Sequence, residues 1–125
     1  MFGFTSKTTR EIGADAEKLA RDFLVQQGLD LVEHNYQIKG GEIDLIMRDE
    51  PHLVFVEVRY RKNNRFGSGA DSVDYRKQSR LIKAATNYLM EKSSHAHQPA
   101  RFDVISITSS DTKPEIEWIK DAFQA

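Results

Sequence analysis

The 125-residue sequence predicts a single α/β domain: a mixed central β-sheet of four to five strands, flanked by helices on both faces. Two observations support this fold class. Apolar residues change between helical spacing and strand-like alternation in the order helix, strand, strand, strand, helix, strand. The chain is also too short for two separate cores of useful stability. We therefore expect residues 1–125 to form one domain.

The first half of the chain predicts one helix and three strands. The helix covers residues 9–28, where apolar side chains recur at helical spacing and Gly28 supplies a stop. Strands are expected at residues 31–38, 42–48 and 53–61. A turn around Pro51 joins the second and third strands, which indicates a hairpin.

The second half predicts a helix between two loops, followed by strands. Residues 62–70 are polar and glycine-rich, as is typical of a loop. The helix is expected to begin at a cap formed by Asp71 or Ser72 and to end near Lys92, with its apolar stripe turned inward. A second loop, a strand at 101–108 and a final strand or turn at 115–119 complete the chain.

The hairpin pattern predicts its own register. If the turn is centred between Glu50 and Pro51, one face receives only apolar pairs, and a slip of one residue would mix them with polar ones. The apolar pairs are Ile43–Val58, Leu45–Val56 and Met47–Val54, and the opposite face receives Glu42–Arg59, Asp44–Glu57 and Ile46–Phe55. We therefore expect the apolar face to be core.

The pair of Asp44 and Glu57 is the candidate metal site. Directly opposed like charges destabilise a sheet unless something positive lies between them. Mg²⁺, or Mn²⁺, suits such a pair because it prefers oxygen ligands and commonly uses one or two carboxylates. The alternative is a surface ion network in which Glu42, Arg59 and Arg61 balance the two carboxylates.

Three further side chains are candidates for the same site. Glu17 lies at the edge of the first helix's apolar stripe, where it either reaches the sheet or is a boundary residue. Lys77 and Gln78 extend the inward stripe of the second helix toward its N-terminus. The alternative for Lys77 is a stem that lies over the core and a charge that reaches water.

Basic residues are concentrated in one segment although the whole chain carries a net charge of -1. Residues 59–80 carry +5, and the rest of the chain carries -6. Such a block suits an anionic partner, although a solvated loop and helix face would look the same. The candidate nucleic-acid-binding residues are Arg59, Arg61, Lys62, Arg65, Arg76, Lys77 and Gln78.

Several classes of site and location are excluded or disfavoured. The chain has no cysteine, which rules out disulfides and thiolate chemistry. No apolar run is long enough to span a membrane and the start lacks a secretory signal, so a cytoplasmic protein without membrane contact is expected. His95 and His97 have no third ligand nearby, and Gly67-Ser68-Gly69 lacks the lysine of a nucleotide-binding loop.

Four stretches together resemble the YraN-like family of bacterial proteins, which is similar to the PD-(D/E)XK nuclease superfamily. They are Gly41-Glu42-Ile43-Asp44-Leu45-Ile46, Phe55-Val56-Glu57-Val58-Arg59-Tyr60-Arg61, Lys77-Gln78 and Arg101-Phe102-Asp103-Val104. The resemblance covers nearly the whole chain. It implies a fold like that of restriction endonucleases and Holliday junction resolvases.

The resemblance also implies roles for individual residues. Asp44 and Glu57 match the acidic metal ligands, and Glu17 resembles the glutamate of the first helix. Arg59 stands where the motif usually has lysine, and an arginine stays protonated and cannot act as a general base. Lys77 is a candidate for the missing lysine, and Asp44, Glu57, Arg59 and Lys77 are together the candidate catalytic residues.

The functional hypothesis is a Mg²⁺-dependent nuclease that acts on DNA or RNA, on branched, single-stranded or nicked substrates. The first alternative is a catalytically inactive nucleic-acid-binding module of the same fold, favoured by Arg59. The second is a partner-binding domain with no nucleic-acid role. The sequence does not distinguish DNA from RNA, endonuclease from exonuclease, or one oligomeric state from another.

Overall fold

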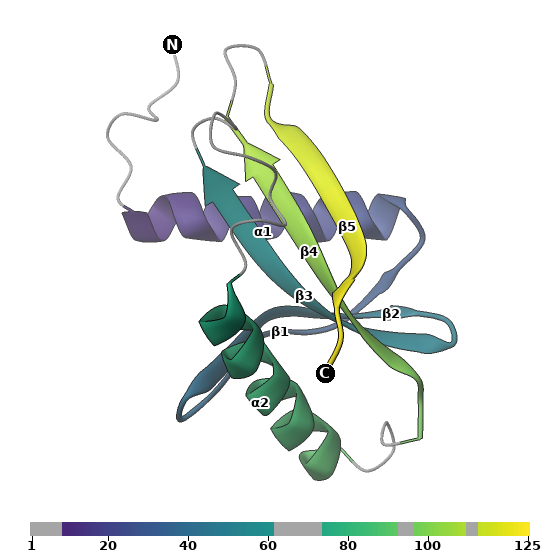
Figure 1. The fold of residues 1–125 in the computed structure, drawn as a ribbon. Coiled ribbons are helices and arrows are strands. Elements are labelled where there is room, and N and C mark those ends of the chain that lie inside the picture. The colour runs from purple at the N-terminus through teal and green to yellow at the C-terminus, as the bar shows by residue number, and fades with distance from the viewer. Residues whose placement is uncertain (1–8, 62–73, 93–96, 110–112) are drawn as a thin grey trace.

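The computed structural model describes residues 9–61, 74–92, 97–109 and 113–125, with the side chains of the first helix described from Gly13 onward. Within these ranges the order of elements is α-β-β-β-α-β-β, which agrees with the predicted order and shows that the last segment, expected as a strand or a turn, is a strand (Figure 1). The elements are α1 (Thr9–Gln26), β1 (Asp30–Ile38), β2 (Gly41–Asp49), β3 (His52–Arg61), α2 (Tyr75–Glu91), β4 (Ala100–Thr108) and β5 (Glu115–Phe123). The predicted loop at 62–70 lies outside the described residues.

The five strands form one mixed sheet in the order β1-β2-β3-β4-β5. The β3–β4 pair is parallel, and the other three pairs are antiparallel. The single parallel pair requires a crossover, and α2 lies within it between β3 and β4. The final element is a full strand on the sheet edge, longer than the predicted 115–119 segment.

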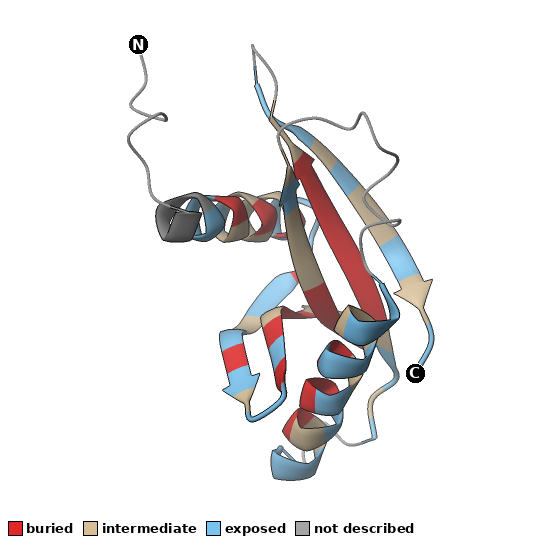
Figure 2. Cartoon of the chain, turned by 60° about the vertical axis from the view of Figure 1, so that its left-hand side comes forward, coloured by how far each residue is buried: buried red, intermediate tan, exposed pale blue. Residues whose placement is uncertain are grey.

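Each helix covers one face of the sheet with its own hydrophobic core (Figures 1 and 2). One core joins α1 to the sheet through Ala16, Ala20, Leu24, Leu45, Met47, Val54, Val56, Ile105 and Ile107. The other joins α2 through Leu81, Ala84, Ala85, Tyr88, Ile43, Ile46, Leu53, Phe55 and Phe102. The predicted α/β architecture with helices on both faces is therefore confirmed. Of the described helices, neither is long and apolar enough to cross a membrane.

The predicted register of the β2–β3 hairpin is confirmed in the half next to the turn. Five pairs match it: Leu45–Val56, Ile46–Phe55, Met47–Val54, Arg48–Leu53 and Asp49–His52. The ladder between β2 and β3 then stops, one step before the predicted pair of Asp44 and Glu57. The strands are therefore already separating where the acidic residues lie.

The prediction that Ile43 shares a core face with Leu45 is wrong. Leu45 packs in the α1 core, whereas Ile43 packs in the α2 core. The neighbouring strand explains the change of face, because Asn35 lies between the pairs His34–Leu45 and Tyr36–Ile43 and has a positive φ of 52°. The β1–β2 hairpin thus turns relative to the rest of the sheet at the level of Asp44.

Helix α2 is fixed at its N-terminus by Asp74 rather than by the predicted Asp71 or Ser72. The Asp74 side chain accepts a hydrogen bond of 2.9 Å from the backbone N of Lys77, which satisfies a helix N–H that would otherwise lack a partner. The sequence offers three capping residues in a row of four, so the spacing alone could not select among them. The helix consequently begins at Tyr75.

A buried network of charged side chains links β2, β4 and β5. Asp103 is fully buried, and its carboxylate accepts hydrogen bonds from the Arg101 guanidinium at 3.0 Å, from Trp118 Nε1 at 2.9 Å and from the Asp121 backbone N at 2.9 Å. Arg101 also donates to Asp49 at 2.9 Å. Because each buried charge has partners, this network ties the hairpin end of β2 to β4 and β5.

Candidate metal and nucleic-acid site

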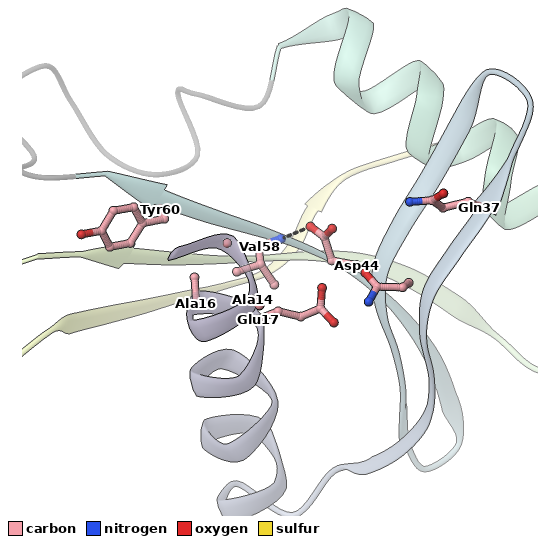
Figure 3. Close-up of a pocket in the computed structure, with 9 residues that line it drawn as sticks. Ala14, Ala16, Glu17, Gln37, Asp44, Val58 and Tyr60 are labelled. Carbon is pink, nitrogen blue, oxygen red and sulfur yellow. Dashed lines mark hydrogen bonds between the residues drawn. The ribbon is translucent and has the colours of Figure 1, made fainter. Parts of the chain in front are cut away.

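Asp44 lies in the gap that opens between β2 and β3. Its Oδ2 accepts a hydrogen bond of 2.8 Å from the backbone N of Val58 (Figure 3). A strand N–H points within the plane of the sheet, so the carboxylate that accepts it lies in that plane, between the two strands. The Asp44 side chain thus takes the place of the ladder partner that Val58 lacks, and both faces of the sheet are close to it.

The surroundings of Asp44 are acidic. Burial, and after it the negative charges of Glu57, Glu17 and Glu42, raise the pKa of Asp44 to about 7, against the hydrogen bond from the Val58 amide, which lowers it. Among the described residues, the charged side chains that shift the pKa of Asp44 are acids. Within this part of the chain the carboxylate of Asp44 is therefore poorly compensated.

Glu17 comes to the same place from α1. The side chain is only 19% exposed, and its Oε1 lies 3.5 Å from Nδ1 of His34 on β1. Burial raises the pKa of Glu17, and the neighbouring His34 and Arg21 lower it. Figure 3 shows the carboxylates of Glu17 and Asp44 projecting into one pocket from α1 and β2. Of the two readings of Glu17, a boundary residue or one that reaches the sheet, the structure supports the second.

Glu57 does not line this pocket. It alternates with Val56 and Val58, which pack against the α1 core, so its side chain leaves β3 toward the α2 face. It is 17% exposed, and its Oε2 lies 3.6 Å from Nη1 of Arg59. The two predicted acids therefore approach the gap from different directions, and Asp44 stands between Glu17 and Glu57.

Among the residues that the structure describes, cations shift the pKa of Glu57 but not that of Asp44. Burial raises the pKa of Glu57, whereas the charges of Arg59 and Lys77 lower it. The predicted ion network thus exists for Glu57 in the form of its pair with Arg59. Glu42 is held elsewhere, because its Oε1 lies 3.3 Å from Nη2 of Arg80 on α2.

At the start of α2, Lys77 and Gln78 are half-buried, whereas Arg76 is exposed. Lys77 belongs to the helix on the face toward which Glu57 points, and its charge lowers the pKa of Glu57. Arg61 is half-buried at the end of β3. The candidate residues Lys62 and Arg65 lie outside the described residues.

Sequence reasoning missed four residues around Asp44. His34 contacts Glu17. The other three, Asn35, Gln37 and Tyr60, line the pocket together with Asp44. Strand alternation could have placed Tyr60 on the same face as Val58, but the turn in β1 that presents Asn35 depends on its positive φ. No periodic pattern reports such a turn.

The carboxylates fit a magnesium or manganese ion by their chemistry. Mg²⁺ is commonly held by one or two carboxylates and keeps several waters, and the poorly compensated Asp44 beside Glu57 or Glu17 offers such a donor set. Among the described residues, no group of three or more histidine or acidic side chains is arranged to hold a metal. The fit is therefore that of a two-carboxylate site completed by water or substrate oxygens.

Comparison with known proteins identifies a protein family whose profile covers these residues. The profile of the uncharacterised protein family UPF0102 matches residues 16–107, which include Glu17, Asp44, Glu57 and Lys77. A UPF0102 protein of Nitrosococcus oceani is 48% identical over 117 residues, 94% of each chain. One of Saccharophagus degradans is 51% identical over 113 residues, 90% of this chain and 92% of the relative. One of Xanthomonas euvesicatoria is 51% identical over 113 residues, 90% of this chain and 91% of the relative.

Proposed function

The chain belongs to the UPF0102 family, and we propose that it is a metal-dependent nuclease that hydrolyses phosphodiester bonds in DNA or RNA. The observation that carries the proposal is the partly buried carboxylate of Asp44, which has Glu17 and Glu57 near it and only acids among the side-chain charges that shift its pKa. A structural carboxylate in such a place would be expected to have a cationic partner. A bound divalent cation supplies one.

Membership of the PD-(D/E)XK superfamily is part of this proposal. Its support is the mixed sheet with a helix on each face, together with acids on the first helix, on β2 and on β3. The three acidic residues that the sequence singled out, Glu17, Asp44 and Glu57, lie around one gap in the sheet. A cytoplasmic location and a nucleic-acid partner belong to the same proposal.

The acidic and the basic residues of the site would have different roles. Asp44 and Glu57 would hold the metal, and Glu17 would assist directly or through water. A bound ion would supply Lewis-acid chemistry toward a phosphoryl oxygen and would make a water molecule at the site more acidic. Lys77 is positioned on the Glu57 side to contact the phosphate and stabilise its developing charge.

Arg59 has a positioning role in this scheme. It cannot accept a proton from water because its guanidinium stays protonated at neutral pH. Its contact of 3.6 Å with Glu57 restrains that carboxylate, and a guanidinium is a donor group that suits a phosphate. The exposed Arg76 and the half-buried Arg61 would add positive charge that attracts a nucleic-acid backbone.

The proposal is tested by incubating the purified protein with single-stranded, duplex, nicked and branched DNA and RNA in Mg²⁺ or Mn²⁺. We expect cleavage of at least one substrate, loss of cleavage with chelator, and loss of cleavage in Asp44→Ala. Asp22→Ala is the matched control, because Asp22 is an exposed acid on α1 paired with Lys18. Absence of cleavage across the panel by a folded protein contradicts the proposal.

The pair of Arg59 and Glu57 favours a second candidate, a nucleic-acid-binding module without catalysis. In that case the guanidinium takes the position of the cation beside Glu57. Binding would then depend on salt, as contacts to phosphates do, but would survive both chelator and Asp44→Ala. Measuring binding and cleavage on the same substrates therefore separates the two candidates.

A further inference from the structure

The pocket beside Asp44 has a size and shape that the metal site alone does not use. Its volume is about 540 Å³, within the range of small-molecule pockets. The wall formed by α1 consists of small residues, Gly13, Ala14 and Ala16, before Glu17 brings its carboxylate to the acidic end (Figure 3). The first turns of α1 thus leave space between the helix and β3.

Tyr60 supplies an aromatic wall further along this pocket. It follows Val58 on the same face of β3, and it is 42% exposed although it lies at a concave surface. Two residues along a strand cover about 7 Å. Tyr60 is therefore close enough to Asp44 for one nucleotide to place its phosphate at the acidic end and its base on the ring.

The opposite wall offers amide groups. Asn35 and Gln37 line the pocket from β1, and both are exposed. Figure 3 shows the Gln37 side chain reaching toward Asp44. An amide carries both donors and an acceptor, which suits the polar edge of a nucleobase.

We propose that this pocket binds one unpaired nucleoside next to the scissile phosphate, so that the substrate is single-stranded or locally unpaired nucleic acid. The proposal rests on the proposed nuclease function and narrows its substrate class. A base within a duplex has its faces covered by neighbouring bases and its edge paired, so it cannot enter such a pocket without leaving the stack. Stacking on tyrosine, by contrast, accepts any base, because every base has an aromatic face.

Gly13 offers a test that does not depend on damaging the fold. A Cβ built on Gly13 meets no atom of the described residues within 4 Å, and Gly13 itself lines the pocket, so we expect a larger side chain there to narrow the pocket. Gly13 lies inside α1, where replacement of glycine by leucine favours the helix. Gly13→Leu should therefore fill the pocket while the protein remains folded, and thermal unfolding verifies that it does.

The experiment uses a fluorescent single strand, its duplex with a complementary strand, and single strands that carry one abasic residue beside the mapped cleavage position. Cleavage is measured in Mg²⁺ and binding by fluorescence anisotropy without it. We expect Tyr60→Ala and Gly13→Leu to lose roughly tenfold or more in binding and cleavage of the single strand, as removal of one base stack does. Tyr60→Phe should retain both, and so should Tyr75→Ala, which removes a tyrosine 82% exposed on α2 and outside the pocket.

The abasic strand separates this inference from the nuclease proposal. The wild type should bind the abasic strand as weakly as Tyr60→Ala binds the intact strand, and Tyr60→Ala should lose nothing further on it. If the wild type cleaves nucleic acid but prefers duplex, or if Tyr60→Ala and Gly13→Leu cleave the single strand normally, the nucleoside pocket is refuted and the nuclease stands. If binding depends on Tyr60 without any cleavage, the nuclease proposal is refuted, and with it the placement of the bound nucleoside beside a scissile phosphate. Failure of the wild type to bind any strand refutes the pocket.

Discussion

The Asp44 carboxylate accepts a hydrogen bond of 2.8 Å from the backbone N of Val58, at the point where β2 and β3 cease to pair. A side chain therefore occupies the position that a main-chain carbonyl holds elsewhere in the ladder. This relationship fixes the orientation of Asp44 without a cation, although neighbouring acids raise its pKa. Orientation and charge compensation of this carboxylate thus come from different sources, and they can be separated by mutation.

The free energy of unfolding should fall as the pH rises from about 4 to about 7 in the absence of metal. The pKa of Asp44 is raised to about 7 in the folded protein, above the usual value of about 3.9 in an unfolded chain. Between these two values the folded state binds a proton that the unfolded state has lost, so stability decreases with increasing pH and is level above 7. Denaturant titrations at pH 5 and pH 8 should differ by at least about 1.4 kcal/mol, which corresponds to one pKa unit.

Asp44→Asn is the matched control for this pH dependence. Asparagine keeps an oxygen that accepts from the Val58 amide but removes the charge. The variant should therefore be at least as stable as the wild type at pH 8, and most of the difference between pH 5 and pH 8 should disappear. An unchanged pH dependence in Asp44→Asn would show that other groups cause it.

Mg²⁺ or Mn²⁺ should raise the thermal unfolding temperature of the wild type at pH 8, by roughly 5 °C at saturating concentration. The ion binds the folded state, where the carboxylates are held together, and it competes with the proton on Asp44. The increase should consequently be smaller at pH 5 and absent in Asp44→Asn. Differential scanning fluorimetry with K⁺ at matched ionic strength controls for salt effects, and an equal shift with K⁺ would contradict a specific site.

Most of the fold could be predicted from the sequence because alternation and helical spacing report which side of an element is buried. The hairpin register is a clear example: only the pairing around Glu50 and Pro51 places apolar residues opposite one another, and the five pairs of the ladder follow it. The same pattern failed at Ile43. Alternation assumes a regular strand, and the positive φ of Asn35 on the adjoining strand marks the place where regularity ends.

The site could be predicted only in part because it depends on the irregular backbone of β1 at Asn35. The acids of β2 and β3 are near each other, as their sequence positions implied, yet Asp44 reaches the gap in the sheet and Glu57 reaches the α2 face. Direct opposition on one face was therefore too simple. The contact between His34 and Glu17 joins residues of different elements, and no sequence spacing encodes it.

Lys77→Ala should reduce the rate of cleavage by about tenfold or more while leaving the fold intact, as loss of a charge that stabilises a transition state does. Lys77 is half-buried at the start of α2, and its charge lowers the pKa of Glu57, so its removal should also raise that pKa. The readout is the maximal rate and its pH profile, which should shift toward higher pH. Lys92→Ala, at the exposed other end of the helix, is the control. An identical loss in both variants would mean that general electrostatics is responsible.

Arg59→Lys restores the residue that the motif usually has, and we expect it to retain or increase cleavage. A lysine there keeps the positive charge beside Glu57 and, unlike arginine, can lose its proton. Arg59→Ala should instead lower both cleavage and affinity, because it leaves Glu57 with less compensation. Rates of all three forms on the same substrate decide the point, and a lysine variant as inactive as the alanine variant would show that the guanidinium geometry itself is needed.

Gly41→Ala should destabilise the protein by about 1–3 kcal/mol because it pushes α2 away from β2. A Cβ on Gly41 would lie 2.5 Å from the carbonyl oxygen of Arg80 and 3.2 Å from the backbone N of Ala84, both main-chain atoms that cannot turn aside. Lys77 lies on α2, so a displacement of this helix should also move Lys77 and weaken nucleic-acid binding. Gly13→Ala is the opposing control: its Cβ meets no atom within 4 Å, and it should stabilise α1 by up to about 1 kcal/mol. Denaturant unfolding shows whether each variant is less or more stable than the wild type. A Gly41→Ala variant as stable as the wild type would show that the close approach of α2 to β2 is not required.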